Sequence, residues 1–188
     1  QDGPISSRNV WSNPVSASSL YAADLAAIRA AAGRIEGSAH RTSVHTSRTL
    51  DDMAGCHLYF KCEQYQRVGA FKFRGAMNAI AKRYDAGHRG PIVTHSSGNH
   101  AQAVALAARL HGLDAHIVMP TNAPTIKRRA VEGYGATVHP CAPLLSERER
   151  TAAQVCSDTG GILIPPYDHP DVIGGQGTAG LELFEQVP

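Results

Sequence analysis

Hydrophobic and polar positions along the middle of the chain form blocks that predict strands and helices in alternation. Short apolar, β-branched runs typical of buried strands lie at residues 91–94, 115–119, 137–139 and 161–164. Longer helix-forming segments lie between them, at residues 98–111, 124–134 and 146–157. The last of these opens on a capping-box pattern, with Ser146 followed by Glu149. Such alternation predicts right-handed crossovers and a parallel sheet flanked by helices, so the expected fold class is α/β.

The flanking segments carry similar patterns. Residues 20–35 predict an amphipathic helix, and residues 48–54 predict a short helix stopped by Gly55. Residues 57–62 alternate in the manner of a strand. Residues 1–19 show no periodicity, which predicts a flexible leader. The chain stops directly after a helical run, where a strand would follow, so we expect it to be the N-terminal portion of a longer protein.

Composition excludes several classes of partner. The 188 residues are 43% hydrophobic, which is enough for one sizeable core and a small second lobe. A formal net charge of +2 argues against nucleic acid or an anionic membrane as a partner, and no apolar run could span a bilayer. The four cysteines form no CxxC pair and the histidines lack ligand spacing, so we predict no metal site. This cysteine usage is typical of a reduced, cytoplasmic protein.

Lys72 is the first candidate for chemistry because Phe71 and Phe73 flank it in the sequence. Apolar neighbours disfavour the ammonium form and lower a lysine's pKa, and a neutral amine is what attack on an aldehyde requires. A lysine that extends its charge past a hydrophobic patch would have the same neighbours. By itself the segment leaves a reactive lysine and a surface lysine equally open.

A second candidate is the polar segment 96–100, which follows a predicted strand and opens a predicted helix. Backbone N–H groups at a helix N-terminus bind anions, and ligands of open parallel sheets bind at the carboxyl ends of the strands. Helix capping needs one polar side chain, whereas this segment holds two hydroxyls, an amide and an imidazole. We therefore interpret it as a binding loop.

Together these segments resemble the two signatures of the fold-type-II pyridoxal-phosphate enzymes. Residues 71–76 and 96–100 are similar to the motifs of the serine/threonine dehydratase and serine racemase branch, as are residues 133–136 and 175–178. The resemblance extends from about Ile35 to the end of the chain. It implies a two-lobed α/β fold with three parts: residues 20–90 in a large cofactor domain, 91–166 in a small mobile domain, and 167–188 returning to the large one.

The resemblance also implies a role for each motif residue. Lys72 would form a Schiff base with pyridoxal phosphate, and Phe71 would pack against its pyridine ring. Asn99 would hydrogen-bond the cofactor's 3′-oxygen, and Ser97 would handle a proton on the face opposite Lys72. The substrate carboxylate would be bound by Ser96, Ser97, Gly98, Asn99, His100 and Arg148. From the residues alone, Arg148 is equally a surface partner for a neighbouring glutamate.

The implied reaction removes water and ammonia from a β-hydroxy amino acid to give a 2-oxo acid, with threo-3-hydroxyaspartate, L-serine or L-threonine as the substrate. An amino-acid racemase is one alternative. A catalytically incompetent fragment is another, because the family's phosphate-binding loop lies beyond Pro188. The same region would hold any divalent cation. The implied partner is a small amino acid, and the full-length protein is expected to be a homo-oligomer, namely a dimer.

Within this branch, residues 69–76 and 165–170 look most like the threo-3-hydroxyaspartate ammonia-lyases. Val68 and Ala70 depart from the dehydratase pattern, which has Thr and Ser at these positions. A second substrate carboxylate would need an additional cation. The candidates for it are His95, Arg148 and His169.

Overall fold

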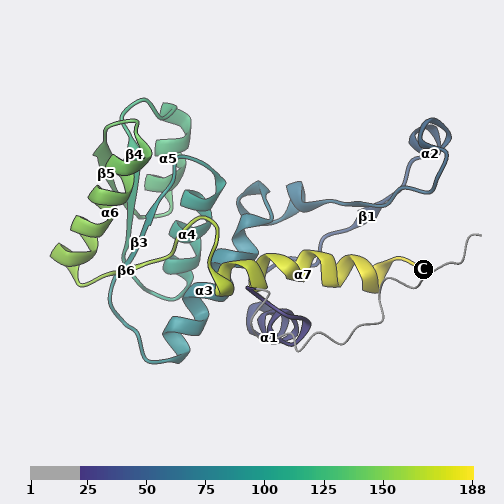
Figure 1. Cartoon of the computed structure of the whole chain (residues 1–188), viewed down its shortest axis with the longest axis horizontal. Helices are drawn as coiled ribbons and strands as arrows, with labels where there is room; N and C mark the ends of the chain where they lie inside the picture. Colours follow the sequence, from purple (N-terminus) through teal and green to yellow (C-terminus); the bar gives the residue numbers. More distant parts are fainter. Residues whose placement is uncertain (1–21) are drawn as a thin grey trace, which may run out of the picture.

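A four-stranded parallel sheet forms one end of the molecule, at the left of Figure 1. The computed structural model describes residues 22–188, so the leader predicted at residues 1–19 lies outside the described part. The strands run in the order β5-β4-β3-β6, and each neighbouring pair is parallel. Their bounds are β3 Ile92–His95, β4 Ala115–Pro120, β5 Thr137–Cys141 and β6 Ile162–Leu163. The predicted α/β class is confirmed.

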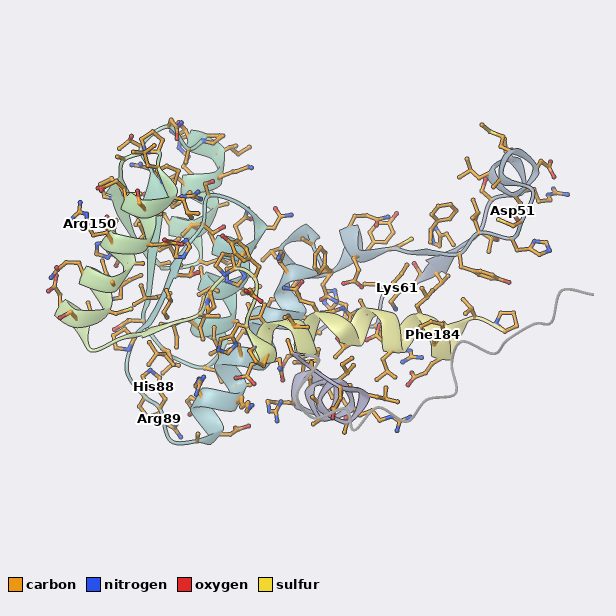
Figure 2. The ribbon with its side chains drawn as sticks, in the orientation of Figure 1. Asp51, Lys61, His88, Arg89, Arg150 and Phe184 are labelled. Carbon is orange, nitrogen blue, oxygen red and sulfur yellow. The ribbon has the colours of Figure 1, made fainter. Side chains whose placement is uncertain are left out.

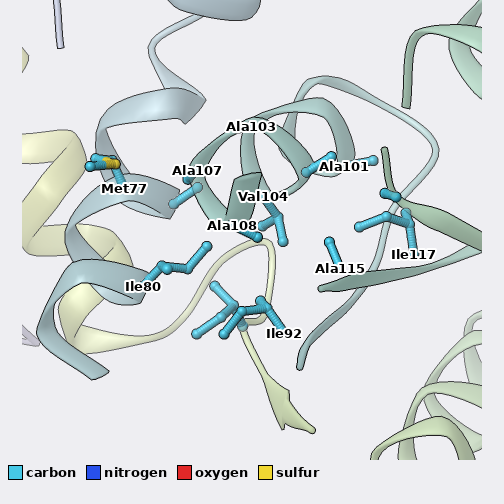
Figure 3. Close-up of a cluster of buried hydrophobic side chains, with 14 of the residues drawn as sticks. Met77, Ile80, Ile92, Ala101, Ala103, Val104, Ala107, Ala108, Ala115 and Ile117 are labelled. Carbon is cyan, nitrogen blue, oxygen red and sulfur yellow. The ribbon is translucent and has the colours of Figure 1, made fainter. Parts of the chain in front are cut away.

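Helices cover both faces of the sheet because alternate residues of a strand point to opposite sides. Ile117 lies in a large core with α4 and α5, whereas its neighbour Val118 packs against α6. The bounds of these helices are α4 Asn99–Leu110, α5 Thr125–Gly133 and α6 Leu145–Thr159. Figure 3 shows the larger core, in which Val104 of α4 gathers with Ile80 and Ile92.

Three further helices build the other half of the molecule: α1 Leu25–Ile35, α3 Lys72–Asp85 and α7 Pro170–Gln186. α3 packs against both α4 and α7, so it joins this half to the sheet (Figure 1). Glycines line the crossing of α3 and α7. A Cβ atom at Gly75 would lie 2.7 Å from the Val172 carbonyl oxygen, and one at Gly175 would lie 2.6 Å from that of Arg74. The crossing therefore requires glycine at both positions.

An arm extends from this half, away from the sheet (Figure 1). It consists of the antiparallel pair β1 Val44–His45 and β2 Phe60–Lys61, with α2 Arg48–Ala54 at its end. Figure 2 labels Asp51 on α2, which has no buried residue. The predicted α2 is confirmed, and Gly55 ends it in the left-handed region at φ 68°. The strand predicted at residues 57–62 shrinks to two residues because only β1 pairs with it.

Most predicted boundaries in the sheet region agree with the structure to within about two residues. The capping box was wrong. α6 begins at Leu145 after Leu144, with no side-chain cap, and the Arg148 N–H bonds to the Leu144 carbonyl. Because the helix is already formed before Ser146, this serine lies inside the first turn and cannot be its N-cap. α1 likewise begins late, where the Asp24 carboxylate accepts a hydrogen bond from the Ala27 N–H at 2.8 Å.

Candidate active site

A sharp turn delivers Lys72 to the start of α3. The preceding turns are the 3₁₀ segments η1 Glu63–Tyr65 and η2 Arg67–Gly69. Val68 has φ 57° and Gly69 has φ 69°, both in the left-handed region. For a β-branched residue this conformation is a true outlier, of the kind found near functional sites. The chain then extends at Ala70 and enters α3, with Lys72 as the first helical residue.

The Lys72 amine lies in a partly desolvated position. It donates a hydrogen bond to the Pro166 carbonyl oxygen at 2.9 Å and lies 5.4 Å from the centre of the Phe71 ring. Phe73 is 0% exposed in the core, so only one of the two flanking aromatic rings reaches the amine, because a helix turns neighbouring side chains apart. Burial lowers the pKa of Lys72. A more readily deprotonated amine is suited to attack on an aldehyde.

Segment 96–100 joins β3 to α4 at the carboxyl edge of the sheet. Gly98 is the N-cap of α4, and no side chain caps this helix end. The Gly98 N–H instead donates to the Ser96 Oγ at 3.2 Å. Ser97 is half-buried and Asn99 is exposed. Simple helix capping therefore does not explain the polar residues, and the helix end lacks a side-chain acceptor, as an anion site requires.

The ring of His100 turns inward from this segment. Its Nε2 donates to the Ile164 carbonyl oxygen at 3.2 Å, and Thr94 Oγ1 donates to the same oxygen at 2.7 Å. The Lys72 amine bonds two residues further on, at Pro166. The end of β3, the start of α4 and the start of α3 therefore converge on the segment that leaves β6. His100 contributes its backbone N–H to the loop, and its ring supports this segment from below.

Burial should make the His100 ring a source of acid sensitivity. It lowers the pKa of His100 from the usual 6.5 to about 4, with the Lys72 charge adding to the effect, so the unfolded chain binds the proton first as the pH falls. The contribution to stability is complete above pH 6.5 and is lost towards pH 4. Chemical unfolding of the full-length protein over this range should show a shallower pH slope for His100→Gln than for wild type. Equal slopes would contradict the assignment.

Arg148 lies on α6 without an acidic partner. Glu147 pairs with Arg150 at 2.6 Å, on the outer side of the helix (Figure 2), and within residues 22–188 no carboxylate lies in ion-pair distance of Arg148. Its charge faces the sheet instead. Burial lowers the pKa of His95 and Arg148 lowers it further; burial raises the pKa of Cys141, an effect that Arg148 opposes. The surface pairing left open by the sequence is absent among these residues.

The other two candidate cations differ from Arg148. The Nδ1 of His169 accepts a hydrogen bond from the Asp171 N–H at 3.2 Å, so this residue caps α7. His95 is buried, and burial favours its neutral form. Arg148 is thus the permanent cation of the three.

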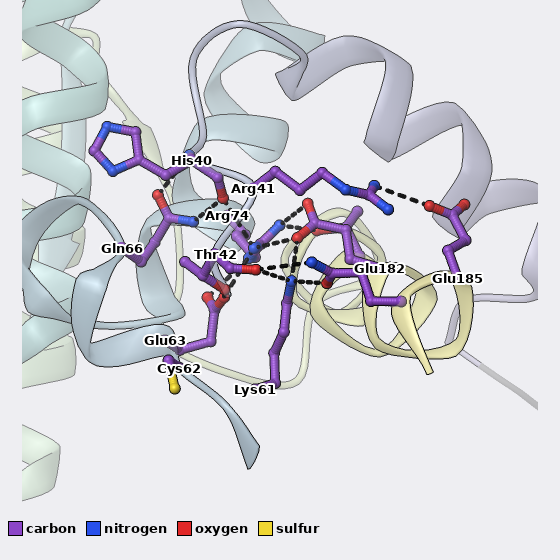
Figure 4. Close-up of polar contacts among 12 residues, drawn as sticks. His40, Arg41, Thr42, Lys61, Cys62, Glu63, Gln66, Arg74, Glu182 and Glu185 are labelled. Carbon is purple, nitrogen blue, oxygen red and sulfur yellow. Dashed lines mark hydrogen bonds and ion pairs between the residues drawn. The ribbon is translucent and has the colours of Figure 1, made fainter. Parts of the chain in front are cut away.

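A buried ion cluster next to Lys72 escaped the sequence interpretation (Figure 4). Its centre is Arg74, which is 0% exposed and bonds to Glu63 and Glu182. An arginine in an otherwise small and apolar stretch of helix was the available signal. Its partners lie 11 and 108 residues away, and nothing in the sequence pairs them.

These residues fit a carbonyl cofactor and an anionic substrate. The amine of Lys72 is partly desolvated, α4 is uncapped, and the Nδ1 atoms of His95 and His100 are buried without a hydrogen-bond partner among residues 22–188. Buried, unpartnered polar atoms are rare in proteins and are typical of ligand sites. In the same described residues no group of three possible ligands gathers for a metal ion.

Comparison with known proteins agrees with this geometry. The family model described as "pyridoxal-phosphate dependent enzyme" matches residues 35–188. The chain belongs to this family. It is 50% identical over 157 residues to L-threo-3-hydroxyaspartate ammonia-lyase of Saccharomyces cerevisiae, which covers 84% of this chain and 48% of that protein.

Serine racemases of the same family are also similar. The human enzyme is 45% identical over 171 residues, covering 89% of this chain and 50% of the racemase. The structure of maize serine racemase superposes with a TM-score of 0.85 at 48% identity, covering 89% of this chain and 51% of that one. The chain thus spans about half the length of these pyridoxal-phosphate-dependent relatives.

Proposed function

We propose that the full-length protein is a pyridoxal-phosphate-dependent ammonia-lyase that removes water and ammonia from a β-hydroxy amino acid, with threo-3-hydroxyaspartate as its preferred substrate. The partly desolvated Lys72 amine, held at the edge of a parallel sheet, is the observation that carries this proposal. The 50% identity to a hydroxyaspartate ammonia-lyase supports the substrate class.

Each motif residue has a task in this proposal. Pyridoxal phosphate, when bound, supplies an electron sink for the charge left by removal of the α-proton. Lys72 would hold the cofactor through its amine and, once displaced by the substrate, take the α-proton as a general base. Phe71, whose ring already lies near the amine and is partly exposed, would pack against the cofactor, and Asn99 would donate to its 3′-oxygen.

The uncapped start of α4 supports the proposed carboxylate site. Ser96, Ser97 and the backbone N–H groups of Gly98, Asn99 and His100 would bind the α-carboxylate there. Arg148 is positioned by α6 at the same edge of the sheet, without an acidic partner among the described residues. We assign it to substrate carboxylate, where a guanidinium can bind with two parallel hydrogen bonds.

The proposal includes a division into lobes. Residues 20–90 and 167–188 would belong to a large domain and residues 91–166 to a small mobile one, whose closure would exclude water from the reaction. No helix among residues 22–188 is both long and apolar enough to cross a membrane. A cytoplasmic location, a homodimer and a divalent cation bound outside this chain stay predictions.

A substrate panel with the full-length protein tests the reaction class and the role of Arg148. We expect kcat/KM for threo-3-hydroxyaspartate to exceed those for serine and threonine, and Arg148→Gln to lower it by about 10- to 100-fold, because a charged hydrogen bond is lost. Arg150→Gln is the matched control, since Arg150 pairs with Glu147 on the outer side of α6. A strong preference for threonine would refute the substrate assignment. Equal effects of the two substitutions would refute the assigned role of Arg148.

Racemisation is a second candidate activity, favoured by the half-buried Ser97 in the loop and by the serine racemase relatives. If Ser97 delivers a proton to the face opposite Lys72, Ser97→Ala should abolish the interconversion of L- and D-serine. Elimination from L-serine should persist, because its base is Lys72. Chiral chromatography of the amino acid together with a 2-oxo acid assay separates the two outcomes. Undiminished racemisation in Ser97→Ala would contradict this role.

A further inference from the structure

We propose that Arg74 is a positioning residue for Lys72: it locks the first turn of α3 onto α7 through a buried ion cluster, so that the lysine amine is held where it captures the cofactor. The inference rests on the proposed function, in which Lys72 carries pyridoxal phosphate. It assigns a task to a side chain that touches neither cofactor nor substrate in the roles given above.

The Arg74 guanidinium is fully enclosed and fully bonded (Figure 4). Nε and Nη2 donate to the two carboxylate oxygens of Glu63, each at 2.8 Å. Nη1 and Nη2 donate to those of Glu182 at 2.7 and 2.9 Å. The His40 carbonyl accepts from Nη2 at 3.1 Å, and the Thr178 hydroxyl accepts from Nη1 at 3.3 Å. Two bidentate carboxylates fix the plane of the guanidinium, and hence the side of α3 from which it extends.

A second cation completes the cluster. The Lys61 amine donates to Glu182 at 2.6 Å and to the Thr42 carbonyl at 2.9 Å. The Thr42 hydroxyl donates to Glu63 at 2.7 Å. Two positive and two negative side chains therefore balance, which is the condition under which buried charges are tolerated. Such a cluster is weak evidence for added stability, since a hydrophobic replacement is often as stable, but it fixes one geometry strictly.

That geometry acts directly on Lys72. Arg74 follows it by two residues, and because each helical residue turns by about 100°, the two side chains leave α3 on nearly opposite sides. The N-cap residue Phe71 makes no side-chain cap hydrogen bond. The Arg74 cluster and the Gly75–Gly175 contact on the α7 side therefore hold the first turn while the amine points the other way, towards Pro166. A displacement of about 1 Å at a reacting group can cost about 100-fold in rate.

The same pair of helices supplies a control for mere stabilisation. Lys82 of α3 pairs with Asp171 of α7, so it also ties the two helices together. It lies ten residues beyond Lys72, about 15 Å along the helix axis. Loss of this pair removes an α3–α7 ion pair without loosening the first turn.

The experiment measures cofactor capture by the full-length protein. Protein freed of cofactor is mixed with pyridoxal phosphate, the Lys72 nitrogen bonds to the aldehyde carbon with loss of water, and borohydride reduces the product for mass spectrometry. The rate of labelling at Lys72 is followed against pH for wild type, Arg74→Met, Arg74→Lys and Lys82→Met, with thermal unfolding in parallel. We expect about a 10- to 100-fold slower capture for Arg74→Met, partial recovery for Arg74→Lys because one ammonium cannot replace the guanidinium fork, and wild-type rates for Lys82→Met.

Two results would overturn the inference: wild-type capture by folded Arg74→Met, or an equal loss in Lys82→Met. If Arg74→Met does not fold, Arg74→Lys decides, since it keeps the charge and loses only the fork; wild-type capture in that variant would count against the proposal. If wild type itself takes up no cofactor, the proposed function fails and this inference fails with it. Slow capture confined to the Arg74 variants supports it.

Discussion

Replacing Lys72 with alanine in the full-length protein should lower turnover by about 10³-fold or more, because the cofactor loses its covalent attachment and the α-proton loses its base. The visible absorbance of lysine-bound cofactor should disappear at the same time. The measurement is an absorbance spectrum of the purified protein after addition of pyridoxal phosphate, followed by a 2-oxo acid assay.

Lys82→Ala is the control, since Lys82 lies on the same helix and 53% of its side chain is exposed. It should keep both the absorbance and the activity. Lys72→Arg separates charge from nucleophilicity, because a guanidinium is always protonated and cannot attack the aldehyde. Unchanged absorbance in Lys72→Ala would show that another group holds the cofactor.

Gly175→Ala should cost about 1–3 kcal/mol of stability, the usual penalty for overpacking a filled interior. A Cβ atom there would lie 2.6 Å from the Arg74 carbonyl and 2.8 Å from the Gly75 Cα, and backbone atoms cannot swing aside as a side chain can. Separation of α7 from α3 would also move the first turn that carries Lys72. The midpoint of thermal unfolding of the full-length protein reports the loss.

Gly180→Ala is the matched control on the same helix. A Cβ atom at Gly180 would have no neighbour within 4 Å, so alanine should leave stability unchanged or raise it by about 0.5–1 kcal/mol through helix propensity. Equal destabilisation by the two substitutions would mean that the helix crossing is not the reason for glycine at position 175.

The alternation of strands and helices was predictable from the sequence because each element follows its own local period. Residues 115–119 and 124–134 were found nearly as they stand in β4 and α5. The capping box at Ser146 failed because α6 had already begun at Leu145, and a short pattern cannot register where the preceding turn starts. The arm failed similarly: β1 is held by two residue pairs with β2, and so short an element has no period to detect.

The site divides in the same way. Lys72 and the segment 96–100 could be found because their chemistry lies in short contiguous motifs. The convergence of Lys72 and His100 on residues 164–166 could not be read from the sequence, because it depends on how β6 pairs beside β3. The Arg74 cluster was missed for a related reason, since long-range charge pairs leave no spacing signal.

Peptide mapping of the full-length protein after borohydride reduction with pyridoxal phosphate tests the account most directly. We predict that the reduced cofactor will be found on one peptide, attached to the ε-nitrogen of Lys72. Attachment at a different lysine, or no attachment under conditions in which the protein turns over threo-3-hydroxyaspartate, would contradict it.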